Sequence, residues 1–200
     1  AESVPAARTK ITGVCPAARA YALAQLAAAQ PAPVWLAVVE EARELETLAE
    51  DLALFVAAVS ASATAPEVVV FPEAQADARE VREAFHAASD RLAVLSRLRH
   101  REGPGVFILT TPGALVQPVP PPEDFSAREL TLRPGTAQPF QALLEVLRQF
   151  DYDSEAVCEA PGQYAVRGGI VDVYPITAHQ PYRLDFFGDA LEEIRTLDPV

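Results

Sequence analysis

The chain has 200 residues, of which 50% are apolar and 22% charged, a composition typical of a globular protein with a sizeable core. Its net charge of −12 argues against direct nucleic-acid binding, because proteins that grip the phosphate backbone carry a basic patch or excess. No apolar run approaches the length of a membrane span and no signal peptide opens the sequence, so we expect a cytoplasmic protein that makes no membrane contact.

The first part of the chain alternates helices with short, continuously apolar strands. We expect helices at 17–30, 41–56 and 78–98, strands at 33–40, 67–72 and 105–111, and a short helix or turn at 112–117. The apolar faces of the second and third helices are predicted at Leu45, Leu48, Leu52 and Phe55, and at Val81, Phe85, Leu92 and Leu95. This β-α-β alternation predicts an α/β domain with a parallel sheet and right-handed crossovers.

The pattern changes at the proline-rich stretch PVPPPEDF (118–125), which we expect to be extended and to separate two domains, 1–125 and 126–200. After it we expect an alternating strand with a turn at 128–135 and a helix at 138–150. The remainder reads as strands with turns at Pro161-Gly162, Gly168-Gly169 and Gly188-Asp189. The second domain is therefore predicted to be a small α+β module with antiparallel hairpins.

No catalytic, cofactor-binding or metal-ligating set can be assembled from the sequence. The stretch before the first long helix, KITGVCPAARA (10–20), has no GK[ST], and Pro16 removes a backbone donor that a phosphate-binding loop would use. We expect no nucleotide there; a divergent nucleotide loop at Thr12-Gly13 is the enzymatic alternative. Cys15 and Cys158, far apart and outside any CxxC, are expected to be buried, reduced thiols. The sequence favours a binding module over an enzyme.

The two glycines at Gly168-Gly169, between alternating apolar runs, predict a tight hairpin. Pairing outward from this turn sets Arg167 opposite Ile170, Val166 opposite Val171, Ala165 opposite Asp172 and Tyr164 opposite Val173. One face, predicted to point to the core, then carries Tyr164, Val166, Val171 and Val173. The other face, predicted to be wet, carries Arg167.

A second hairpin is predicted in YRLDFFGDALEEIR (182–195), although ALEEIRTL (190–197) also has helical spacing. Tyr182, Leu184 and Phe186 share one face of its first strand, and Arg183, Asp185 and Phe187 share the other. An arginine and a phenylalanine side by side on a wet face are typical of a protein-interaction hot spot. A surface cation–π pair, or a ring covered by another domain, is the structural alternative.

The sequence GQYAVRGGIVDVYP (162–175) followed by PYRLDFFGDALEEIRTLDP (181–199) resembles the UvrB-homology module at the N-terminus of the bacterial transcription-repair coupling factors, the Mfd family. ITGVCPAARAYALAQL (11–26) is similar to that family's opening strand and degenerate loop. UvrB shares the hairpins and is the runner-up, but the resemblance to it implies an intact phosphate loop and a long aromatic hairpin, which this chain lacks.

The resemblance implies that the first domain is a degenerate helicase-like domain without ATPase activity and that the second docks onto UvrA. It assigns the UvrA contact to Arg167, Arg183 and Phe187. It also implies that ATP, RNA polymerase and DNA are bound by other domains of a parent DNA translocase, beyond residue 200. The missing initial Met fits a fragment, the second sheet is expected to continue past Val200, and another domain of the parent is a candidate to mask the docking face.

Overall fold

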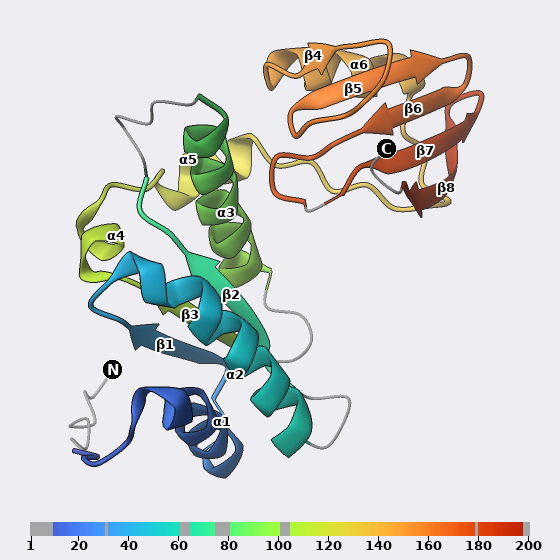
Figure 1. The fold of residues 1–200 in the computed structure, drawn as a ribbon. Coiled ribbons are helices and arrows are strands. Elements are labelled where there is room, and N and C mark those ends of the chain that lie inside the picture. Colours follow the sequence, from blue (N-terminus) through green and yellow to red (C-terminus); the bar gives the residue numbers. More distant parts are fainter. Residues whose placement is uncertain are drawn as a thin grey trace. The chain divides into compact units, whose positions relative to one another are not determined.

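The computed structural model describes residues 10–30, 32–60, 65–74, 81–100, 105–178 and 180–197, with side chains of the third helix described from residue 87 onward. The chain divides into two compact units (Figure 1). The first comprises Ala1–Ala74 and Leu98–Val116, and the second Gln75–Arg97 and Gln117–Val200. The expected boundary between residues 125 and 126 stays a prediction.

The first unit is built on a three-stranded parallel sheet in the order β1-β3-β2 (Val34–Val38, Val106–Thr110 and Glu67–Phe71). All five residues of the central strand β3 are buried. Alternate residues point to opposite faces, so burial at every position means that both faces of β3 are covered, which explains why its sequence, VFILT, is apolar up to Thr110 rather than alternating. The predicted parallel α/β arrangement is confirmed.

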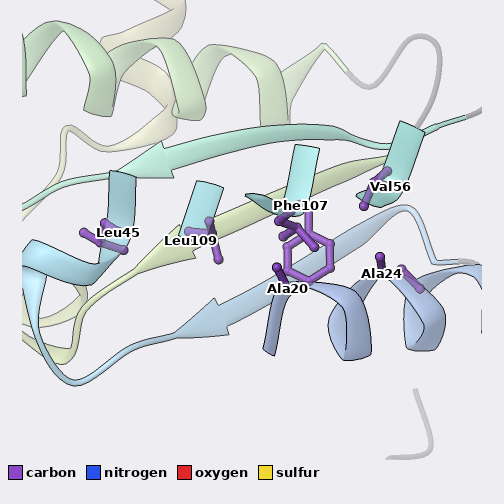
Figure 2. Close-up of a cluster of buried hydrophobic side chains, with 8 residues drawn as sticks. Ala20, Ala24, Leu45, Val56, Phe107 and Leu109 are labelled. Carbon is purple, nitrogen blue, oxygen red and sulfur yellow. The ribbon is translucent and has the colours of Figure 1, made fainter. Parts of the chain in front are cut away.

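Two helices cover one face of this sheet, α1 (Arg19–Ala29) and α2 (Leu45–Val59), preceded by the short 3₁₀ turns η1 (Pro16–Ala18) and η2 (Ala42–Glu44). Figure 2 shows their side chains meeting those of β3: Ala20 and Ala24 from α1, Leu45 and Val56 from α2, and Phe107 and Leu109 from the strand. Phe107 is 1% exposed and stacks on Trp35 of β1, with ring centroids 5.8 Å apart. Burying one such ring stabilises the fold by roughly 1.5–3 kcal/mol.

Two expectations for the first part of the chain are corrected. Residues 10–15 contain no strand, so the opening strand implied by the resemblance is absent there. In α3 (Val81–Arg99), Leu92 and Leu95 are only half-buried, and the deeply buried side chains include Ala87, Arg91 and Val94. These lie at four- and three-residue spacing on a face rotated from the predicted one; Val81 and Phe85 lie outside the described side chains.

After α4 (Pro112–Val116), the proline-rich stretch is helical in part, contrary to expectation. The helix α5 (Pro122–Ala127) begins with Pro122 and has Glu123 and Asp124 in its first turn. Proline suits the first helical position because that N–H has no helical partner, and acidic side chains favour the N-terminal end of the helix dipole. The predicted strand at 128–135 is also absent: the segment is irregular, with a turn at Pro134–Gly135.

The second unit contains a five-stranded mixed sheet in chain order, β4-β5-β6-β7-β8 (Asp153–Ser154, Gln163–Arg167, Ile170–Val173, Tyr182–Phe187 and Ala190–Thr196). The β4–β5 pair is parallel and the other pairs are antiparallel. One face packs on α6 (Phe140–Gln149) through the following buried residues: Leu143, Leu144 and Leu147 of the helix, and Tyr164, Val171, Val173, Leu184 and Leu191 of the sheet. The predicted antiparallel hairpins and helix are confirmed, and 190–196 is a strand rather than a helix.

Candidate protein-binding site

Two hairpin turns hold the candidate site in place. Gly168 and Gly188 have left-handed φ angles of +62° and +61°, at the first central position where a type II′ turn calls for glycine. Gly169 is needed for a different reason: a Cβ there would lie 2.8 Å from the carbonyl oxygen of Phe186. The backbones approach this closely because the Phe186 N–H donates to the Gly169 carbonyl, at 2.9 Å. The turns thus pin β6 against β7.

The register of the first hairpin is the predicted one in all four pairs, from Arg167 opposite Ile170 to Tyr164 opposite Val173. Tyr164, Val171 and Val173 are buried in the core, as expected. Val166 is not: it is 39% exposed. The short strand β4 pairs only with Gln163 and Tyr164, so β5 has an open edge beyond them.

The opposite face, called here the outer face, is not uniformly wet. Ala165 is 1% and Asp172 6% exposed. Asp172 is paired in register with Arg183 of β7, whose Nε and Nη2 donate to the two carboxylate oxygens at 2.7 Å each. This two-pronged, charge-assisted bond raises the pKa of Arg183 above its usual value, so the guanidinium stays charged. Its side chain remains 29% exposed.

Arg167 lies on the same outer face, at the rim of the first turn. Its side chain is exposed, and its Nη2 donates to the carbonyl oxygen of Ala156 at 2.9 Å. Because β6 separates β5 from β7, the strands that carry Arg167 and Arg183 run about 10 Å apart. The two guanidiniums are therefore separate contact points on one face.

Phe187 ends β7 with 77% of its surface exposed. It lies opposite Ala190, two residues past Asp185, just beyond a β-bulge between Asp185 and Phe186. Asp189, two residues after Phe187, accepts a hydrogen bond from the Phe140 N–H through its carboxylate, at 3.2 Å, and so caps α6. The turn that carries the ring is thereby tied to the helix beneath the sheet.

The structure thus brings Arg167, Arg183 and Phe187 onto one face, as the pleat predicted. Sequence reasoning missed two further elements there: the carboxylate partner of Arg183, and a second pair in which Arg195 Nη2 lies 2.5 Å from Asp185 Oδ2. A regular two-residue hairpin would place Ile194 opposite Arg183, and the β-bulge brings Arg195 there instead, so no signal in the sequence points to this pair. The 174–181 connection has no two-residue turn signal from which the β6–β7 register could be read.

Residues 10–15, where the resemblance implies a degenerate nucleotide loop, are exposed. Gly13 has φ +81° with nothing within 4 Å of the position that a Cβ would take, and Pro16 opens η1 shortly after it. Cys15 is exposed, which corrects the expectation of a buried thiol; Cys158 is half-buried, and both cysteines are free. Among the described residues, no group of three or more His, Cys, Asp or Glu could hold a metal ion, and no helix is long and apolar enough to cross a bilayer.

Known proteins match both units of the chain. Residues 130–200 match the UvrB interaction domain family. The chain is 34% identical over 196 residues to the transcription-repair-coupling factor of Myxococcus xanthus, covering 96% of this chain and 16% of that protein. It is 26% identical over 155 residues to that of Bacillus subtilis (strain 168), covering 78% and 12%. A match to the UvrABC system protein B of Thermus thermophilus is 30% identical over 79 residues, covering 40% and 12%.

The chain spans between 12% and 16% of the length of these relatives. The family match begins five residues after the expected domain boundary and contains the whole mixed sheet with its outer face. The resemblance drawn from the hairpins is confirmed: this chain is homologous to a segment of the transcription-repair-coupling factors, and it carries a UvrB interaction domain.

Proposed function

We propose that the chain is the UvrA-recruiting segment of a cytoplasmic transcription-repair coupling factor, and that UvrA docks on the outer face through Arg167, Arg183 and Phe187. The observation that carries this proposal is Phe187, a phenylalanine ring 77% exposed on the charged outer face of a sheet. Exposed aromatic and arginine side chains grouped in this way are the residues that dominate protein–protein binding energies. The match of residues 130–200 to the UvrB interaction domain supports a docking site in this part of the chain.

The rigidity of the sheet favours binding. Phe187 is the last residue of β7, a strand paired on both sides, and the turn after it is fixed by the glycine φ and by the Asp189 cap. Little main-chain entropy is therefore lost when a partner covers the ring, so most of the gain from burying it appears as affinity.

The test is a titration of the 200-residue chain with UvrA from the same organism, read by calorimetry. We expect Phe187→Ala to weaken binding by about 2 kcal/mol, roughly 30-fold, and Arg167→Ala by about 1 kcal/mol. Both side chains are exposed, so the melting temperature should stay close to that of the wild type.

Matched controls come from outside the face. Leu54 on α2 is 71% exposed, and Arg133 is exposed in the irregular segment before α6. Leu54→Ala and Arg133→Ala should bind UvrA like the wild type. Wild-type affinity in Phe187→Ala and Arg167→Ala would refute the docking site.

We further propose that this chain has no ATPase activity and that ATP, RNA polymerase and DNA are bound by other parts of the parent protein. The open loop at residues 10–15, which runs straight into Pro16, supports this. A ligand that binds only the folded state raises the melting temperature by mass action. Millimolar ATP with Mg²⁺ should leave the melting temperature of the chain unchanged; a concentration-dependent rise would support the divergent nucleotide loop instead.

A further inference from the structure

We propose that Asp172 is a positioning residue: its buried carboxylate fixes the Arg183 guanidinium so that one edge of that group faces the docking partner. The inference rests on the proposed function for the identity of the partner, but it concerns a residue that does not itself face the partner.

The first observation is where Asp172 lies. It sits in β6 between Ala165 of β5 and Arg183 of β7, on the outer face rather than the core face. Its side chain is only 8% exposed. A carboxylate is expensive to remove from water unless it is paired and hydrogen-bonded, and an apolar residue would serve the sheet at least as well. Stability alone therefore does not explain an aspartate here.

The second observation is the geometry of the pair. Nε and Nη2 of Arg183 each donate to a different oxygen of Asp172, both at 2.7 Å. A planar guanidinium held along this edge cannot rotate without breaking a bond. Both hydrogens of Nη1 and the second hydrogen of Nη2 remain for other acceptors. The 29% of the side chain that is exposed is thus held in one orientation before any partner arrives.

The neighbouring pair on the same face provides the contrast. Both Nε and Nη2 of Arg195 donate to a single oxygen of Asp185, at 3.2 and 2.5 Å, and Glu193 lies 3.4 Å from the same Nε. The Arg195 side chain is 52% exposed, and Asp185 is 23% exposed. A guanidinium shared between two carboxylates, one of them 60% exposed, is not fixed in the way that Arg183 is. The outer face therefore holds one arginine that is oriented in advance and one that is not.

Prior orientation matters because binding an arginine otherwise requires ordering a long side chain. The free edge of Arg183 presents N–H donors only, so the group it fits on the partner is a carboxylate or a carbonyl oxygen. Releasing Arg183 from Asp172 should weaken this contact by the ordering penalty of one side chain, about three- to tenfold in Kd.

The experiment is a double-mutant cycle in the 200-residue chain, with Asp172→Asn, Arg183→Lys and the two combined. Lysine keeps the positive charge beside Asp172 but cannot form the two-pronged bond. We expect Asp172→Asn to weaken UvrA binding by about three- to tenfold. We expect the combined variant to bind within about twofold of Arg183→Lys, because the carboxylate acts through the guanidinium.

A second readout needs no partner. In the wild type, the Arg183 Nε–H should give a distinct, slowly exchanging ¹⁵N–¹H resonance, because that hydrogen is bonded to a buried carboxylate. In Asp172→Asn it should move and broaden while the backbone amide spectrum keeps its dispersion. A purely structural role would disturb the backbone spectrum and the melting temperature without this selective change.

Asp185→Asn is the matched control, since it breaks the other ion pair of the same face. It should leave the Arg183 Nε–H resonance in place and reduce affinity less than Asp172→Asn does.

Three results would overturn the inference. Asp172→Asn could bind UvrA like the wild type, or Asp185→Asn could lose as much affinity as Asp172→Asn does. In the third, the fold-losses in affinity of Asp172→Asn and Arg183→Lys multiply in the combined variant, which would mean that the two residues act independently. If Phe187→Ala and Arg167→Ala weaken binding while Asp172→Asn does not, only the positioning role fails. If none of the variants affects binding, or if UvrA does not bind at all, the docking proposal fails with it.

Discussion

The two sheets of this chain differ in how much of their surface is buried. In the parallel sheet, the central strand β3 is buried at all five positions, and its neighbours lie on both sides. In the mixed sheet, one face packs on α6, while the other carries Arg167, Arg183 and Phe187 with 77% of the ring exposed. The difference teaches where function can reside: the central strand of the parallel sheet leaves no side chain for a partner, whereas the face of the mixed sheet opposite α6 carries exposed groups.

The largest effect is expected where the parallel sheet is most completely buried. Phe107→Ala removes a ring that is 1% exposed and stacked on Trp35. It should lower the free energy of unfolding of the first unit by about 3–5 kcal/mol, through lost burial and the cavity left behind. Urea unfolding followed by Trp35 fluorescence measures this directly, and Leu54→Ala, at an exposed site of α2, should cost less than about 0.5 kcal/mol.

A smaller but more specific effect is expected on the outer face of the mixed sheet. Arg183→Ala leaves Asp172 buried without its partner, which for a fully buried pair costs about 3–5 kcal/mol; partial exposure of Arg183 should reduce this to about 2 kcal/mol. Adding Asp172→Asn should restore part of the loss, because the stranded charge is removed. Thermal melts of the single and double variants check this. A double variant less stable than Arg183→Ala would show that the sheet needs the aspartate for another reason.

The smallest effect concerns the edge of the same sheet at high pH. Burial raises the pKa of the Cys158 thiol from 9.0 to about 11, whereas the exposed Cys15 lies in a bare loop. The neutral thiol is favoured in the folded state, so its contribution to stability is complete below pH 9 and is lost as the pH rises from about 9 towards 11. Cys158→Ser should flatten this part of the stability–pH profile, and alkylation at pH 8 should modify Cys15 well before Cys158. Equal alkylation rates at the two thiols would contradict the predicted difference.

Much of the fold could be predicted because its signals are local. Helical spacing in α2 and the apolar runs of β1, β2 and β3 each depend on neighbouring residues, and the Gly168-Gly169 turn fixed the register of β5 and β6 to the residue. The predictions failed where the determining contact is distant. The segment 128–135 alternates like a strand, yet its backbone is irregular, and the contacts that hold its end against the second hairpin are the Gly135 N–H bond to Leu191 and the Ala137–Ala190 bridge.

The candidate site, too, could be predicted from the sequence only in part. The exposed positions of Arg167 and Phe187 followed from the pleat and the turns. The partner of Arg183 did not, because it depends on how β6 and β7 pair across a connection of eight residues rather than across a two-residue turn. Burial of Asp172 on a face that alternation marks as wet could not be read from the sequence either, since the pattern places a residue on a face without saying what covers it.

The bulge in the second hairpin has a consequence for how Phe187 is presented. Asp185 pairs with Glu193 and Phe186 with Leu191, so Glu192 is the extra residue. Leu191 and Ile194 are three residues apart, so in a regular strand they would point to opposite faces. The extra residue lets both pack on the core while Glu193 points outward, so the core depends on the bulge. The same extra residue bends and twists the strand pair just before the ring, so a glutamate on the opposite strand helps to set the angle at which Phe187 leaves the sheet.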